Sequence, residues 1–221
     1  PNAIFQGMHR LDPGTALIID LDSNSVTAER YWQWPDGSVI DTRSEDDVIE
    51  ALRHEMSEAV RIRLRSDVPL GAFLSGGMDS AAVLALMAKH SSRPVKTFTI
   101  GFGDPEYDEL ADARSTAAAF GADHHEQIVT PDAVRVAEAL AFNYDEPFAD
   151  ASAIPTYYVA ALARQHVTVC LSGDGGDELF AGYTPYADAL ARVAPAGVEM
   201  LRGILGAGAR MVPVHARGKG R

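Results

Sequence analysis

The pattern of hydrophobic and polar residues in the middle of the chain gives short segments with the character of strands, separated by longer stretches with the character of helices. The expected strands lie at residues 68–74, 95–100, 124–129 and 167–171. Between and beside them we expect helices over 81–89, 105–120, 131–142 and 152–165. This alternation predicts an α/β fold with a parallel sheet that helices cover on both faces.

Local signals mark the ends of several helices. Ser44 and Asp47 have the spacing of a capping box, with Asp where Glu or Gln is usual, and they predict an amphipathic helix of about 20 residues. Asp104-Pro105 favours the start of another helix, and Gly121 is expected to be its C-cap. Ser152 has the position of an N-cap for the helix over 152–165.

The first 43 residues follow a different pattern. An apolar run at 16–20 lies between turn signals, and residues 25–34 form a candidate partner strand. Because two strands alone are marginally stable in water, we expect this segment to join a larger sheet or to pack on the rest of the protein. The chain starts with Pro1, so we expect it to be part of a longer protein. The stretch 190–221 has weaker patterning.

Composition and charge narrow the classes of function. The 221 residues carry a formal net charge of −12, so binding of nucleic acid would need a strong local basic patch. The single cysteine, Cys170, excludes an intramolecular disulfide framework and a zinc site built from several cysteines. No apolar run has the length of a membrane span, and the N-terminus lacks the pattern of a signal peptide. We therefore expect a cytoplasmic enzyme or binding domain.

Two glycine-rich loops follow buried strands at their carboxyl ends, where open α/β sheets bind ligands. The first is Ser75-Gly-Gly-Met-Asp-Ser80, which leads directly into a helix. Its glycines allow close approach of an anion, and the hydroxyl groups and the helix N-terminus supply donors and positive potential for a phosphate. The loop lacks the Gly-Lys-Ser/Thr signature of a P-loop and the spacing of a dinucleotide fingerprint.

Carboxylates accompany both loops. Asp79 lies within the first loop, and Asp174, Asp177 and Glu178 lie in the second, Ser172-Gly-Asp-Gly-Gly-Asp-Glu178. A carboxylate beside a phosphate needs a cation between them, and Mg²⁺ takes one or two carboxylates together with phosphate oxygens. Asp79 and Asp177 are therefore candidates to share Mg²⁺. Each loop alone also fits a tight turn with helix-capping residues, but their pairing favours a site for phosphate and metal.

These loops resemble known motifs. The first is similar to the SGGxDS pyrophosphate motif of ATP pyrophosphatases. Together with residues 171–183 and Tyr144-Asp-Glu-Pro147, it resembles the synthetase domain of glutamine-hydrolysing asparagine synthetases, over roughly residues 44–190. Residues 7–14 and 30–32 resemble the end of that family's N-terminal glutaminase domain. The resemblance implies two regions, 1–43 from a glutaminase domain and 44–221 from an ATP-binding domain that is C-terminally incomplete.

The resemblance also implies roles for individual residues. Leu74 and Ile100 would flank adenine, and Ser172 and Gly173 would contact the nucleotide. Four residues of the first loop would hold the pyrophosphate: Ser75, Gly76, Gly77 and Ser80. Asp79 and Asp177 would bind Mg²⁺, and Asp174 would take the catalytic position at which many members carry Glu. The family's catalytic lysine has no clear counterpart in residues 184–221, where Lys219 is a poor candidate.

The implied reaction is amide synthesis through an acyl-adenylate. Aspartate or a related carboxylate would react with ATP to release diphosphate, and ammonia derived from glutamine would then give the amide and AMP. The resemblance implies neither nucleic acid nor membrane as partner and is compatible with a homodimer. Two alternatives stay open: another adenylating enzyme of this fold, such as a β-lactam-forming or tRNA-modifying enzyme, and a non-catalytic ATP-binding fragment.

Other chemistry-bearing residues have plainer interpretations. His124 and His125 are neighbours on a predicted strand, so they would point to opposite faces and make a poor metal pair. Cys170 fits a small core residue, and Trp32 and Trp34 fit packing positions. The acidic residues near the end of the 131–142 helix suit turns and caps as well as they suit substrate binding; they are Asp145, Glu146 and Asp150. Ser152 is a second candidate for the acceptor pocket.

Overall fold

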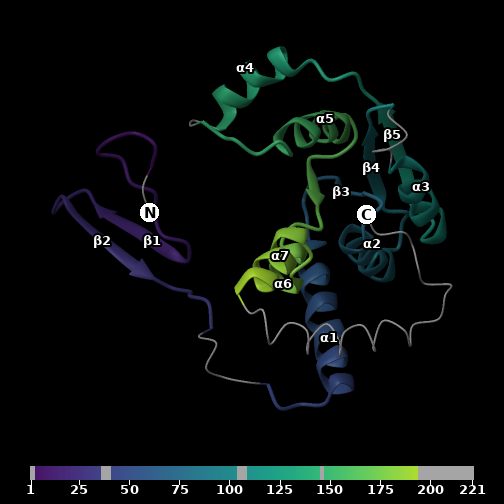
Figure 1. The fold of residues 1–221 in the computed structure, drawn as a ribbon, viewed down its shortest axis with the longest axis horizontal. Helices are drawn as coiled ribbons and strands as arrows, with labels where there is room; N and C mark the ends of the chain where they lie inside the picture. The colour runs from purple at the N-terminus through teal and green to yellow at the C-terminus, as the bar shows by residue number, and fades with distance from the viewer. Residues whose placement is uncertain (1–2, 36–40, 104–108, 145–146, 194–221) are drawn as a thin grey trace.

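The computed structural model describes residues 3–35, 41–103, 109–144 and 147–193, and its centre is a four-stranded parallel sheet (Figure 1). The strands are β3 (Leu70–Phe73), β4 (Lys96–Gly101), β5 (Asp123–Ile128) and β6 (Val169–Leu171). Their spatial order is β5-β4-β3-β6, so the chain runs outward from β3 to β5 and then returns to the other side of β3. The parallel sheet predicted from the sequence is confirmed.

Helices cover both faces of this sheet, as the alternation of strands and helices predicts. On one face lie α2 (Met78–His90) and α3 (Leu110–Ala119), and α1 (Glu45–Arg63) packs against α2. On the other face lies α5 (Ala153–Arg164), with α4 (Ala133–Tyr144) beside it. The two layers of helices bury both sides of the central strands.

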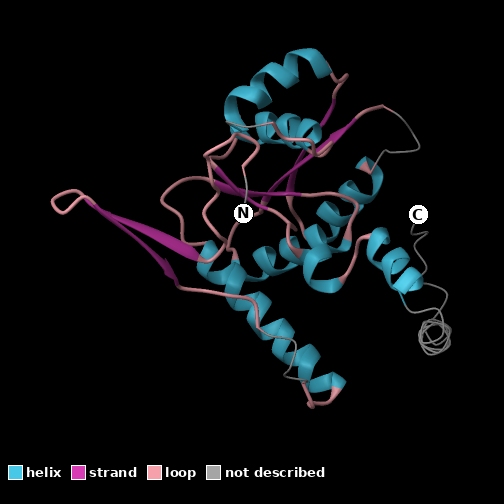
Figure 2. Ribbon diagram, turned by 60° about the vertical axis from the view of Figure 1, so that its left-hand side comes forward, coloured by secondary structure: helices cyan, strands magenta, loops and turns pink. Residues whose placement is uncertain are grey.

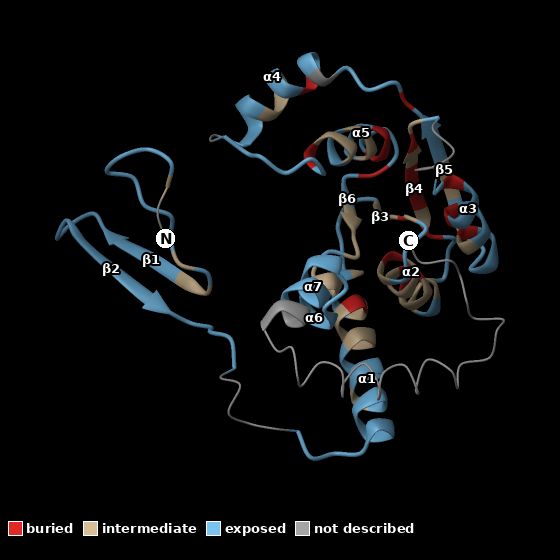
Figure 3. Ribbon diagram, viewed as in Figure 1, coloured by how far each residue is buried: buried red, intermediate tan, exposed pale blue. Residues whose placement is uncertain are grey.

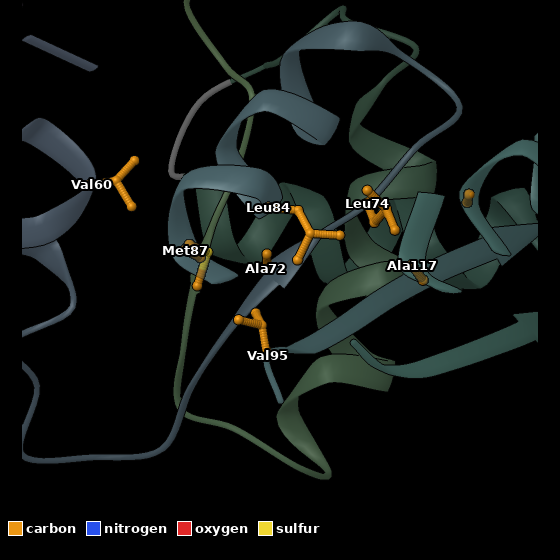
Figure 4. Close-up of a cluster of buried hydrophobic side chains, with 8 residues drawn as sticks. Val60, Ala72, Leu74, Leu84, Met87, Val95 and Ala117 are labelled. Carbon is orange, nitrogen blue, oxygen red and sulfur yellow. The ribbon is translucent and has the colours of Figure 1, made fainter. Parts of the chain in front are cut away.

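The side-chain alternation of the strands divides the core into two clusters. Ala72 and Leu74 face the helices of the first layer, where they pack with Leu84 and Met87 of α2 (Figure 4). Phe98 of β4 is fully buried and packs against α5 on the other face. Full burial of a side chain of this size stabilises the fold by roughly 1.5–3 kcal/mol.

Element boundaries differ modestly from the sequence prediction. α2 starts at Met78, three residues before the predicted Ala81, because the chain enters the helix directly from the glycine loop. Two helices at the C-terminal side were not predicted, namely α6 (Gly176–Phe180) and α7 (Thr184–Val193). α6 has five residues, which is too short for helical periodicity to be visible in the sequence.

The two predicted N-caps have different outcomes. The Ser44 side chain accepts a hydrogen bond from the Asp47 amide at 3.2 Å, which confirms the start of α1. The Asp47 carboxylate accepts from the Ser44 hydroxyl at 2.5 Å. Ser152 is the N-cap residue of α5, as predicted, but its side chain makes no capping hydrogen bond. The Ser152 amide donates to the Asp150 carboxylate at 2.8 Å.

A hairpin of two antiparallel strands precedes the α/β unit. β1 (Thr15–Asp20) pairs with β2 (Ser25–Arg30), which is shorter than the predicted 25–34 segment. The hairpin projects from the rest of the molecule (Figure 2), and its residues are exposed except for the half-buried Thr15 (Figure 3). Within the described residues, the hairpin forms its own sheet and does not extend the central one.

Several sequence predictions concern residues outside the described ranges. These are the helix start at Asp104-Pro105, the acidic residues Asp145 and Glu146, and the tail that contains Lys219. Among the described helices, none combines the length and the apolar character that crossing a bilayer requires.

Candidate functional site

The two glycine-rich loops meet because of the strand order. β3 and β6 are neighbours in the sheet, although one comes early in the α/β unit and the other late. The chain leaves β3 through α2 toward β4, and it reaches β6 on the other side of β3 only after it returns from β5. The carboxyl ends of β3 and β6 therefore lie together at one edge of the sheet, where open α/β sheets bind ligands. Both loops line a cavity of about 1240 Å³ at the carboxyl ends of the strands.

The first loop is held together by its own serines. The hydroxyl groups of Ser75 and Ser80 lie 2.9 Å apart, and the Ser75 amide donates to the Ser80 hydroxyl oxygen at 3.1 Å. The Gly77 amide donates to the Ser75 hydroxyl oxygen at 3.2 Å. Ser80 is only 7% exposed. Its hydroxyl therefore closes the loop on itself, in addition to the ligand role expected from the sequence.

The loop ends at the N-terminus of α2, which faces the cavity. Gly77 is the N-cap residue and supplies no side-chain acceptor for the first turn. Met78 and Asp79 of that turn line the cavity with Gly77. The helix spans 13 residues, so its first amide groups and its dipole provide the positive end that favours a phosphate.

The residue before the loop is fixed at two points of its backbone. The Leu74 amide donates to the carbonyl oxygen of Phe98 at 3.0 Å, and the buried Thr99 hydroxyl donates to the Leu74 carbonyl oxygen at 2.5 Å. The Leu74 side chain is 3% exposed and belongs to the core under α2. Ile100 is half-buried and, like Leu74, lines the cavity. The structure thus brings both expected adenine neighbours to the same cavity.

Glycine is required in the second loop because it packs closely on the first. A side chain on Gly173 would lie 2.8 Å from the Ser80 amide nitrogen and 3.0 Å from Cβ of Asp79. A side chain on Gly176 would overlap the Asp79 carboxylate. Gly175 has a φ of 93°, a left-handed conformation that favours glycine. Their close packing makes the two loops a single surface.

The carboxylates expected to bind metal share this cavity. Asp79 leans over Gly176, and Asp177 leans over Gly182, where a side chain would overlap its carboxylate. Both residues line the cavity. Within the described residues, no group of three or more His, Cys, Asp or Glu side chains could hold a metal alone. Two carboxylates fit Mg²⁺, which completes its shell with phosphate oxygens and water.

The catalytic candidate of the second loop is anchored locally. The Ser172 hydroxyl donates to the Asp174 carboxylate at 2.8 Å, and both residues line the cavity. This contact orients Asp174 and uses the hydroxyl proton of Ser172. Ser172 is also the residue that the family resemblance assigns to nucleotide contact. Gly173 also lines the cavity between them.

Two acidic contacts at the cavity were not predicted. The Tyr183 hydroxyl donates to the Glu178 carboxylate at 2.6 Å, which lowers the pKa of Glu178 and raises the pKa of Tyr183 to about 12. On the opposite side, the Gly76 amide donates to the Glu109 carboxylate at 2.9 Å across 33 residues of sequence. Neither pairing leaves a signal in the sequence, because each depends on how elements meet in space.

The charged groups around the cavity are of one sign. Within the described residues, its lining contains no Lys, Arg or His. It contains six acidic residues: Asp79, Glu109, Asp150, Asp174, Asp177 and Glu178. Ser152, the candidate for the acceptor pocket, also lines the cavity. Apolar residues of α1 and α5 line the remaining wall. A polyanion that enters this cavity needs cations to accompany it.

The histidines and Cys170 have structural surroundings. His124 bonds Thr97 at 2.9 Å, while His125 stacks on His166 with ring centroids 4.0 Å apart, so the neighbours face opposite sides as predicted. Burial raises the pKa of Cys170 to about 11, which disfavours the nucleophilic thiolate.

The two tryptophans contact each other and stay largely exposed. The rings of Trp32 and Trp34 lie edge to face, with centroids 5.1 Å apart, and the residues are 46% and 66% exposed, so neither is a core position of the described residues.

Comparison with known proteins identifies similar chains. Residues 51–213 match the family model for asparagine synthase. A putative glutamine-hydrolyzing asparagine synthetase 2 from Methanocaldococcus jannaschii is 40% identical over 185 residues, which cover 83% of this chain and 35% of that protein. Glutamine-hydrolyzing asparagine synthetase 1 from Bacillus subtilis is 35% identical over 191 residues, covering 86% and 30% respectively.

One further relative also matches the N-terminal hairpin region. A putative glutamine-hydrolyzing asparagine synthetase from Mycobacterium tuberculosis is 35% identical over 222 residues, which cover 99% of this chain and 34% of that protein. The chain therefore spans about a third of the length of the curated relatives that it matches.

Proposed function

The chain belongs to the asparagine synthase family, and we propose that its α/β unit activates a carboxylic acid with ATP as an acyl-adenylate for transfer to ammonia. The observation that carries this proposal is the meeting of two glycine-rich loops in one cavity at the carboxyl ends of the neighbouring strands β3 and β6. The first loop offers a helix N-terminus for phosphate groups, and the second brings carboxylates beside it. The overall reaction would convert the carboxylic acid, ATP and ammonia into an amide, AMP and diphosphate.

The nucleotide would bind across the edge of the sheet. Leu74 and Ile100 are proposed to flank the adenine, with Ser172 and Gly173 on the side of the second loop. The pyrophosphate would lie against the first loop, whose members are Ser75, Gly76, Gly77 and Ser80. The N-terminal end of α2, which the first loop enters, would stabilise the negative charge of the diphosphate as it leaves.

Asp79 and Asp177 are proposed to hold Mg²⁺ at this cavity. Their carboxylates approach from the two loops, and the tight packing of Asp79 over Gly176 fixes one of them. When bound, the ion supplies the positive charge that lets ATP enter an acidic cavity and that stabilises the leaving diphosphate. The carboxylate oxygens of Asp79 and Asp177 support this proposal, because Mg²⁺ prefers oxygen ligands.

Asp174 is proposed to act beside the reacting centre. Its carboxylate is oriented by the Ser172 hydroxyl at 2.8 Å, next to the backbone that faces the first loop. The acceptor would enter from the side of the cavity lined by Ser152 and by Pro155 and Thr156 of α5. In this proposal the acceptor carboxylate lies on one side of the nucleotide and the pyrophosphate loop lies on the other.

Aspartate is the proposed acceptor, and glutamine is the proposed source of ammonia. Residues 1–43 are proposed to be the end of a glutaminase domain, which agrees with the separate, exposed hairpin. The alternatives that remain are another adenylating enzyme of this fold with a different acceptor and an ATP-binding chain without catalysis.

The proposal is tested by product analysis. The full-length protein that contains this chain is incubated with α-labelled ATP, aspartate, ammonium and Mg²⁺, with a control lacking aspartate; the 221 residues alone are expected to bind ATP with Mg²⁺ but to turn over poorly. Ammonium makes the assay independent of glutamine hydrolysis. We expect AMP, diphosphate and asparagine only when aspartate is present. Release of ADP and phosphate would contradict adenylation, and binding of ATP without any product would favour the non-catalytic alternative.

A second measurement separates the tRNA-modifying alternative. Affinity for tRNA is measured across a range of salt concentrations. Given the net charge of −12, we expect negligible binding. A steep loss of affinity with rising salt would show phosphate contacts and would favour that alternative.

A further inference from the structure

Glu109 makes an unusual contact with the first loop. It is the residue before α3, but its side chain does not cap its own helix. Its carboxylate instead accepts a hydrogen bond from the Gly76 amide at 2.9 Å. Glu109 is exposed and lines the cavity, whereas Gly76 is exposed but does not line it, so the contact lies at the rim of the cavity.

The Glu109 carboxylate differs in charge from the acceptors that the two neighbouring loop amides use. The Ser75 amide bonds the Ser80 hydroxyl, and the Gly77 amide bonds the Ser75 hydroxyl. These neutral acceptors belong to the loop itself. Gly76 alone among the three has an anionic acceptor, and that acceptor comes from another element. A phosphate oxygen is also an anionic acceptor and makes the same kind of bond to a glycine amide.

A purely supporting role for Glu109 explains the contact less well. α3 already contacts this part of the loop through packing, since a side chain on Gly76 would lie 3.2 Å from Cβ of Asp112 and 3.4 Å from Cβ of Glu109. A neutral acceptor would hold the amide equally well without adding negative charge beside a phosphate site. The carboxylate instead repels any anion that approaches the loop.

We propose that Glu109 is a built-in competitor for the pyrophosphate subsite, an inference that rests on the proposed nucleotide-binding function. In the nucleotide-free protein its carboxylate occupies the Gly76 amide. An incoming diphosphate group takes over that amide, and the exposed Glu109 side chain turns toward solvent. The contact lowers the affinity for free polyanions and leaves the loop in a bonded state when no nucleotide is present.

The test measures binding of inorganic diphosphate with Mg²⁺ to the full chain by calorimetry. Variants Glu109→Ala and Glu109→Gln are compared with the unchanged chain. We expect both to bind roughly three- to tenfold more tightly, the range expected when one nearby like charge is removed. The difference should shrink at high salt, because screening weakens repulsion between exposed charges.

A matched control comes from the same helix. Asp112→Asn removes an equal charge one turn away, close to Gly76 but without a hydrogen bond to its amide. We expect a smaller gain than in Glu109→Ala. Thermal unfolding of each variant shows whether the fold is retained.

The outcomes separate the two proposals. Unchanged or weaker binding by Glu109→Ala, with binding by the unchanged chain, would overturn the competitor role alone. Absence of binding by the unchanged chain and by both variants would overturn the diphosphate site and the competitor together. Binding that appears only after the substitution would support both.

Discussion

The carboxylate of Asp79 lies directly against the α-carbon of Gly176, so that any side chain at position 176 would overlap it. Asp79 belongs to the helix that follows β3, and Gly176 begins the short helix that follows β6. This contact joins the two loops and determines where the Asp79 oxygens lie. Glycine at 176 is needed for close approach.

Replacement of Gly176 by Ala should therefore act through Asp79. The added methyl group forces the carboxylate to move, so we expect affinity for Mg²⁺–ATP to fall by at least about fivefold, equivalent to roughly 1 kcal/mol. Calorimetric titration measures the change. Gly121→Ala is the control: it strains a left-handed residue with φ 62° and meets no atom within 4 Å. The control should lose stability but bind as before, and equal affinity in Gly176→Ala would contradict the argument.

Asp79 and Asp177 should behave as a coupled pair. If they share one Mg²⁺, Asp79→Asn and Asp177→Asn each weaken Mg²⁺-dependent binding of ATP, and the double variant loses less than the sum of the two. Binding measured at several Mg²⁺ concentrations gives the coupling. Asp67→Asn lies outside the cavity lining and serves as a charge-matched control. Strictly additive losses would argue for two independent roles.

The sheet and the meeting of the two loops could be predicted from the sequence, because both depend on residue patterns within short segments of the chain. β3 lies in an apolar run, and the glycine-rich segment after it marks the carboxyl edge of the sheet. Because both loops lie at this edge, it could be predicted that Asp79 and Asp177 lie near each other. The resemblance to a known family added residue roles that periodicity does not contain.

Other features depend on tertiary placement. The bond between Glu109 and Gly76 joins residues that are 33 positions apart, and its existence depends on where α3 begins relative to the loop. Ser152 has the N-cap position of α5, but its side chain makes no capping hydrogen bond. Residue type indicated the start of the helix, whereas Pro155, three residues later, has no amide hydrogen that the Ser152 hydroxyl could accept.

Thr99 should be important for stability out of proportion to its size. Its hydroxyl donates to the carbonyl oxygen of Leu74, and both residues are less than 5% exposed. Thr99→Val keeps the shape but leaves that oxygen without its partner, so we expect a loss of about 1–3 kcal/mol in the free energy of unfolding. Thr99→Ser restores the donor and should recover most of the loss. Chemical denaturation measures both, and a valine variant as stable as the unchanged chain would contradict the role.

His124 should make the stability of the α/β unit depend on pH. Its ring nitrogen Nδ1 bonds the Thr97 hydroxyl at 2.9 Å, and Nε2 lies 3.7 Å from the Glu126 carboxylate. Burial, the largest influence, lowers the pKa of His124; Glu126 opposes this effect, whereas Arg114 and His125 add to it. Because the folded state binds this proton less readily than the unfolded state, its contribution is fully favourable above the unfolded pKa of about 6.5.

Stability should accordingly fall as the pH is lowered through that value toward the depressed folded pKa. His124→Asn keeps a group that can bond Thr97 but does not titrate. Denaturation curves between about pH 7 and pH 5 should therefore show a smaller decline in the variant than in the unchanged chain. The comparison isolates His124, because both proteins share every carboxylate that titrates at lower pH. Parallel profiles for the two proteins would show that burial of this ring is not what couples folding to protons in this range.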